Sequence, residues 1–178
     1  MTKKKSYVAE VNLETICKHE AGHAVMRWLQ GMKCTDIVAT EKGGAVFGSG
    51  EKISNFNLLH ITLGGFAVES NYGFMEVEFK SCHGADWECA RTLIGQHIYL
   101  RSIFQPKTDQ SYIASVEVAL KYHFTQSCDM LRPYDDLIEE MGEALMQSGR
   151  LSRRMVMKII RDWVKTEGYE DLYLPPVW

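Results

Sequence analysis

Two histidines and a glutamate near the start of the chain have the spacing of a metal-dependent hydrolase. Residues 19–23 read His-Glu-Ala-Gly-His, an HExxH pattern inside a stretch expected to be helical. Histidines four residues apart lie one above the other on a helix, so His19 and His23 can bind one zinc ion. Glu20 then projects beside the metal, where it can act as a general base. The pattern predicts a zinc hydrolase with Zn²⁺ as its cofactor.

A hydrolytic zinc ion takes three protein ligands and keeps a fourth position open. The extension that supplies a third histidine in metzincins is absent, because His23 is followed by Ala-Val-Met-Arg-Trp-Leu. The third ligand must therefore come from another part of the chain. The candidates by side-chain type are Asp86, Glu69, His83, Glu88 and Cys82.

Helices account for most of the structure expected around this pattern. The first begins after Asn12, a favourable N-cap residue, and ends before Gly31. The apolar spacing and the capping residues predict further helices over about 54–72, from 86 to about 100, and over 109–130, 133–147 and 153–167. Within the helix over 54–72, Gly64 and Gly65 predict a close approach to another helix, with a break in the helix as the alternative.

A short β hairpin is expected directly after the first helix. Its strands are Cys34–Thr40 and Ala45–Phe47, and Gly43-Gly44 is the expected turn. The sequence thus predicts a mainly α fold with one small hairpin. We expect a single domain over residues 1–178, with irregular tails at 1–11 and 169–178.

The composition excludes several other classes of protein. The chain has 178 residues, 46% hydrophobic and 24% charged, as in an ordinary globular domain. Its net charge of −3 gives no reason to expect a nucleic-acid partner. No apolar run approaches the roughly 20 residues that a membrane helix needs. Five scattered cysteines without a CxxC pair indicate reduced thiols, so we expect a cytoplasmic protein that binds no membrane.

Three segments of the chain resemble the protease domain of the FtsH-type, membrane-anchored AAA+ zinc peptidases. Residues 18–25 read KHEAGHAV, close to the family's YHEAGHAV. Residues 63–69 read LGGFAVE, similar to LGGRAAEE, and residues 84–90 read GADWECA, similar to GAxxDLxxAT. The segments follow one another in the family's order, and the resemblance extends from about Leu13 to Trp163. It implies the helical fold and the peptidase activity of that family.

The resemblance also implies which residue completes the zinc site. In the family it is the aspartate of the third segment, which corresponds to Asp86. This chain departs from the family because Asp86 follows Gly84-Ala85 directly, where the family has two residues between. The altered loop keeps His83 and Glu88 as alternative ligands. A second metal site at Cys82-His83 is a further possibility.

Glu69 matches the first of two family glutamates, and Ser70 stands where the second would be. We expect Glu69 to orient a zinc-binding histidine through a hydrogen bond from outside the metal shell. The alternative is an acid in a salt bridge between packed helices. His60, His97 and His123 have no metal-like partner nearby in the sequence, and we expect them to be structural or surface residues.

The expected function is an ATP-independent zinc endopeptidase. The chain carries no Walker A phosphate-binding pattern, so we expect it to cleave only flexible or unfolded segments of a protein or peptide substrate. Its partner could be a separate ATPase or further copies of the chain. The strand around Gly44, Ala45, Val46 and Phe47 is a candidate edge for an extended substrate, or an ordinary structural hairpin. The alternative functions are a non-catalytic zinc-binding interaction or regulatory module, and a helical protein with no metal.

Overall fold

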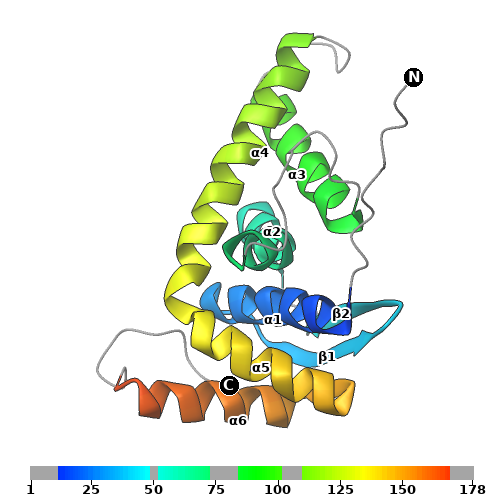
Figure 1. Cartoon of the computed structure of the whole chain (residues 1–178). Helices are drawn as coiled ribbons and strands as arrows, with labels where there is room; N and C mark the ends of the chain where they lie inside the picture. The colour runs from blue at the N-terminus through cyan, green and yellow to red at the C-terminus, as the bar shows by residue number, and fades with distance from the viewer. Residues whose placement is uncertain (1–11, 49–51, 73–83, 102–109, 169–178) are drawn as a thin grey trace, which may run out of the picture.

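Helix α1 (Leu13–Leu29), which carries the HExxH pattern, lies at the centre of the computed structural model. Helix α2 (Asn55–Asn71) packs on one side of it and α5 (Asp135–Ser148) on the other (Figure 1). Nearly every residue of α1 from Ile16 to Trp28 is buried. The HExxH pattern is therefore part of the core.

The structure describes residues 12–48, 52–72, 84–101 and 110–168, and the side chains of 98–101 are not included. The predicted irregular tails lie outside the described residues. So do Cys82 and His83, two of the alternative metal ligands.

The remaining helices enclose this centre. Helices α3 (Ala85–Arg101) and α4 (Gln110–Leu131) pack against α2 and against each other. A 3-10 turn, η1 (Arg132–Tyr134), leads from α4 into α5, and α6 (Arg153–Thr166) packs on α5 at the bottom of Figure 1. The buried apolar side chains of all these helices form one continuous cluster. The prediction of a mainly helical fold is confirmed.

A small antiparallel sheet lies beside α1. Strand β1 (Cys34–Thr40) is central and pairs with β2 (Gly43–Gly48) on one edge and with β3 (Arg150–Ser152) on the other. The predicted hairpin is present, but the third strand was not predicted. It forms because the buried side chain of Leu151 lies opposite the equally buried Ile37.

The predicted turn of the hairpin was wrong by two residues. Thr40 pairs with Gly43, so the turn consists of Glu41 and Lys42, and Gly43 and Gly44 belong to β2. Gly43 has a φ of +133°, which side-chain-bearing residues rarely adopt. The two glycines therefore start the returning strand.

Helices α1 and α2 meet backbone to backbone. A Cβ atom on Gly22 would lie 2.7 Å from the carbonyl oxygen of Gly64, and one on Gly64 would lie 2.9 Å from the carbonyl oxygen of Gly22. Helix α2 continues unbroken through Gly64 and Gly65. The predicted close helix approach is confirmed, and the alternative of a broken helix is wrong.

Among the described residues, no helix is both long and apolar enough to cross a membrane.

Candidate metal centre

The two histidines of α1 and an aspartate of α3 come together in three dimensions. His19 and His23 lie one helical turn apart, and their Nε2 atoms are separated by 3.0 Å. Asp86, in the first turn of α3, places Oδ2 at 3.3 Å from Nε2 of His19 and 3.2 Å from Nε2 of His23. These three atoms form the group of possible metal ligands found in the described part of the chain.

The three distances fit a zinc ion. Zinc binds histidine nitrogen and carboxylate oxygen at about 2.0–2.2 Å in a tetrahedron, which places two ligand atoms about 3.3–3.5 Å apart. The observed separations of 3.0, 3.2 and 3.3 Å need only a slight expansion to reach that value. Three ligands of this kind leave the fourth tetrahedral position open.

Hydrogen bonds on the far side of each imidazole ring assign the tautomers. Nδ1 of His23 donates to the carbonyl oxygen of Ile61 at 2.7 Å, and a carbonyl oxygen can only accept. Nδ1 of His19 lies 2.6 Å from Oε1 of Glu69 and donates to that carboxylate. Both Nε2 atoms are then left with a lone pair directed at Asp86. Three electron-rich atoms this close together require a shared proton or a cation between them.

The electrostatics of the cluster favour a positive charge at its centre, because a proton on either Nε2 atom can be shared with Asp86. Burial lowers the pKa of His19, but hydrogen bonds to Asp86 and Glu69 outweigh it and raise the pKa to about 9. Burial would raise the pKa of Asp86, yet hydrogen bonds from His19 and His23 hold it well below its usual range. The cluster thus stabilises positive charge at its centre, as a metal site must.

Glu69, expected to orient a zinc-binding histidine, contacts His19 of the candidate cluster. Its side chain is 13% exposed, and its described polar contact is the one with His19. Because it binds the nitrogen that faces away from Asp86, Glu69 orients the His19 ring and does not join the ligand group. Glu88, an alternative ligand, is exposed and lies 3.9 Å from Arg91, outside the cluster.

Glu20 lines a cavity of about 260 Å³ that opens at the cluster. The side chain is 6% exposed, and burial raises the pKa of its carboxyl, partly offset by His23 and His19. Gly44 of β2 packs directly on the Glu20 side chain, and a Cβ there would lie 2.7 Å from Oε1. The candidate substrate edge therefore forms a wall of this cavity. The cavity is lined by Glu20, His23, Arg27, Gly44, Ala45, Val46, Ile61, Thr62 and Asp86.

Ala45 and Val46 of the candidate edge line the cavity, and Phe47 is exposed. Strand β2 has β1 on one side only, so its other edge has no strand partner among the described residues. This backbone edge runs past Glu20, and an unpaired edge of this kind can pair with an extended chain.

Sequence reasoning did not identify Ile61, Thr62 or Arg27 as site residues. Ile61 acts through its backbone carbonyl, for which the residue type gives no signal. Arg27 could have been found, because it follows His23 by four residues and so continues the face that carries His19 and His23.

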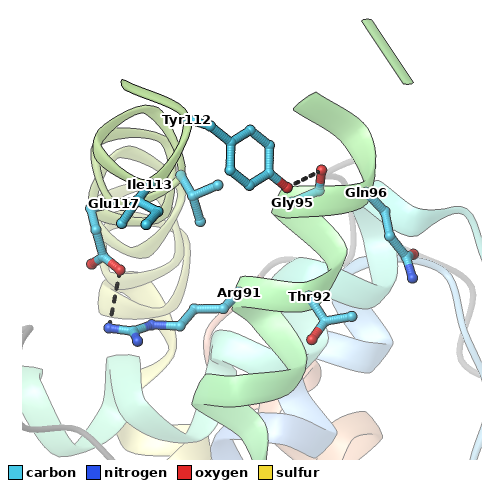
Figure 2. Close-up of a pocket in the computed structure, with 8 residues that line it drawn as sticks. Arg91, Thr92, Gly95, Gln96, Tyr112, Ile113 and Glu117 are labelled. Carbon is cyan, nitrogen blue, oxygen red and sulfur yellow. Dashed lines mark hydrogen bonds and ion pairs between the residues drawn. The ribbon is translucent and has the colours of Figure 1, made fainter. Parts of the chain in front are cut away.

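A second hollow, of about 390 Å³, lies between α3 and α4 away from the metal cluster (Figure 2). Arg91 pairs with Glu117 across it at 3.1 Å, and the Tyr112 hydroxyl donates to the carbonyl of Gly95. Although it is larger than the cavity at Glu20, it contains none of the clustered metal-ligand groups. The smaller cavity is therefore the better candidate for a reaction site.

Comparisons of the chain with protein-family models and with curated proteins found no match.

Proposed function

We propose that this chain is a zinc-dependent peptidase that hydrolyses peptide bonds in flexible or unfolded protein segments. The observation that carries the proposal is the His19, His23 and Asp86 cluster, with the Glu20 carboxylate at its side in a cavity bordered by an open strand edge. The likeness of the sequence to FtsH-type peptidases supports the same activity.

Different residues of the chain would bind the metal and transfer the proton. His19, His23 and Asp86 would hold the zinc ion, which supplies Lewis-acid chemistry when bound. Glu20 takes the proton from the attacking water and delivers it to the leaving nitrogen, so that it acts first as a base and then as an acid. Its raised pKa brings it closer to neutrality, where both transfers are efficient.

The backbone of β2 orients the substrate. An extended chain that pairs with the open edge at Gly44, Ala45 and Val46 would pass directly over Glu20. Recognition through backbone hydrogen bonds accepts many side chains but requires an unfolded segment. Cleavage of a folded protein would therefore need a partner that unfolds it, such as a separate ATPase.

We place this activity in the cytoplasm. The four cysteines that the structure describes, Cys17, Cys34, Cys89 and Cys128, are free thiols, as expected for a reducing compartment.

The test compares the wild type with Glu20→Gln, which keeps the shape of the side chain and removes the base. Both proteins should bind one zinc ion per chain by elemental analysis. The wild type should cleave an unfolded substrate such as casein, lose activity on treatment with a chelator and regain it with zinc. Glu20→Gln should be at least about 100-fold slower.

Exposed Glu143 on α5 provides the matched control, and Glu143→Gln should cleave as the wild type does. Full activity of Glu20→Gln would contradict the mechanism. Stoichiometric zinc without cleavage of any peptide in a broad library would instead favour the non-catalytic zinc-binding module, and a folded protein that binds no zinc would contradict both.

A further inference from the structure

Arg27 is a buried charge in the wall of the cavity at Glu20. It lies one helical turn after His23 on α1, is 7% exposed and lines the same cavity as Glu20 and Gly44. A guanidinium withdrawn from water to this extent is unfavourable unless it meets a negative charge or several acceptors. The mechanism proposed above does not use it.

The described contacts of Arg27 satisfy one donor of the five that a guanidinium carries. Its Nε donates to the backbone carbonyl of Lys33 at 2.7 Å. Within residues 12–48, 52–72, 84–101 and 110–168, the structure gives Arg27 no carboxylate partner. Cys34 is a titratable neighbour, but burial raises the pKa of its thiol to about 12, so it is no counter-charge at neutral pH.

The guanidinium is fixed in position. The bond to Lys33 holds Nε, and the outer nitrogen lies directly over Gly48, where a Cβ atom would overlap it. Gly48 ends β2, the strand whose beginning at Gly44 packs on Glu20. A cation held rigidly in this way is preorganised for a planar, two-oxygen partner.

The side chains of Arg27 and Glu20, both on α1, contact β2 at two points whose separation an extended peptide can span. They are seven residues apart on α1, about 10 Å along the helix axis. Gly44 and Gly48 are four residues apart on β2, about 13 Å along the strand. A substrate lying along β2 would therefore reach Arg27 about three residues from the bond beside Glu20.

We propose that Arg27 binds a carboxylate of the substrate within about three residues of the cleaved bond. Two sources supply that chemistry, the side chain of an Asp or Glu residue and the free carboxyl terminus of the peptide. The cavity volume of about 260 Å³ is below the roughly 300–1,000 Å³ of pockets that enclose whole small ligands, so it takes one part of a chain. This inference rests on the peptidase function proposed above and names its substrate class.

The test measures peptide binding separately from cleavage. Zinc-loaded Glu20→Gln protein is titrated with fluorescent ten-residue peptides of one neutral sequence, in which a single Glu or its Gln counterpart occupies each position in turn. Every peptide is made with a free and with an amidated carboxyl terminus. Fluorescence anisotropy should show about 10- to 100-fold tighter binding for the carboxylate in one register or at the free terminus. A preference that follows the Glu position identifies the side chain, and one that follows the free terminus identifies the chain end.

The same titrations are repeated in the Glu20→Gln background with Arg27→Gln, Arg27→Lys and the exposed control Arg154→Gln. Arg27→Gln should abolish the carboxylate preference, Arg27→Lys should weaken it, and Arg154→Gln should retain it. Zinc content and circular dichroism identify a variant that fails to fold. In that case the Glu20→Gln protein with Arg27 intact decides, because equal affinity for Glu and Gln peptides in all registers and for both termini overturns the proposal.

The outcomes also separate this inference from the peptidase function. Cleavage by the active protein without any carboxylate preference would support the peptidase function and contradict the role of Arg27. A carboxylate preference that depends on Arg27, in a protein that cleaves no peptide, would support the carboxylate-binding site and contradict the peptidase function.

Discussion

At the scale of single residues, the candidate centre depends on hydrogen bonds that fix which nitrogen of each histidine is free. Ile61 and Glu69, both on α2, hold the Nδ1 atoms of the two rings and so direct both Nε2 atoms to one point. Asp86 meets them there from a third element. The ligand assignment and the role of Glu69 can be tested separately.

Replacing the possible third ligands one at a time should single out Asp86. Asp86→Ala removes the carboxylate 3.2–3.3 Å from both imidazoles, so we expect zinc affinity to fall by at least about tenfold. Cys82→Ala, His83→Ala and Glu88→Ala should bind zinc as the wild type does. Competition with a chromophoric chelator measures the affinities. A larger loss in His83→Ala than in Asp86→Ala would assign the third ligand to the altered loop.

Glu69→Gln should weaken zinc binding without removing it. The amide retains the size of the side chain but loses the charge that makes the His19 imidazole a stronger ligand, and changes of this kind lower metal affinity about 10- to 100-fold. Glu139→Gln, which removes a carboxylate paired with Lys18 away from the metal, serves as control. Equal zinc affinity of Glu69→Gln and wild type would mean that Glu69 has only a packing role.

At the scale of helices and strands, the glycines of α2 determine how closely the histidine-bearing helix can approach. Gly65 lies directly under the His19 ring, and a Cβ there would overlap the imidazole. The acceptors of the two cross-helix hydrogen bonds, Ile61 and Glu69, lie on either side of this glycine, so both bonds depend on the same helix spacing.

Gly65→Ala should therefore impair metal binding, even though alanine has the higher helix propensity. Alanine favours a helix by about 1 kcal/mol over glycine, but overpacking of this kind costs about 1–3 kcal/mol and displaces a ligand ring. Gly95→Ala in α3 is the control, because its new methyl group would meet the hydroxyl end of Tyr112, away from the His19 ring. Chemical denaturation and zinc titration should separate the two variants. Wild-type zinc affinity in Gly65→Ala would contradict this role of the glycine.

The helix boundaries could be predicted because the capping residues are local signals. Asn12 and Ser54 cap α1 and α2 through side-chain bonds to the third residue beyond them, and Gly149 ends α5 with a φ of +68°. Strand β3 could not be predicted, because three residues carry no alternation and form a strand only where β1 lies alongside. The position of Arg27 on the face that carries His19 and His23 could be predicted from its spacing, but its burial could not, since that depends on β2.

At the scale of the whole molecule, a buried histidine on α2 links folding stability to pH. His60 is 1% exposed and donates through Nδ1 to the Ser127 hydroxyl of α4. Burial, with a smaller contribution from His123, lowers the pKa of His60 to about 4. The expectation that His60 is structural agrees with this position.

Stability should fall as the pH drops from about 6.5 to 4. The unfolded chain protonates His60 near its ordinary pKa of about 6.5, whereas the folded chain resists until about pH 4, so the unfolded state binds more protons in this window. The loss attributable to His60 is at most about 3 kcal/mol, and it disappears once the pH is about one unit above 6.5. Urea titrations across this range measure it.

His60→Gln supplies the comparison, because the neutral amide can still donate to Ser127. The variant should be less stable at pH 7.5 but lose less stability on acidification, while the metal ligands titrate equally in both proteins. Parallel stability curves for the two proteins would contradict the assignment.

The three side chains of the candidate metal centre differ in how far they are enclosed. His19 and His23 are 14% and 9% exposed and locked to α2, whereas Asp86 is 42% exposed at the rim. The two histidines are thus held in place by α2, whereas the Asp86 side chain is accessible from the surface. In the proposed metal site, selectivity could be altered at Asp86 alone: histidine or cysteine there would supply a softer donor and favour copper, while the helix pair beneath stays unchanged.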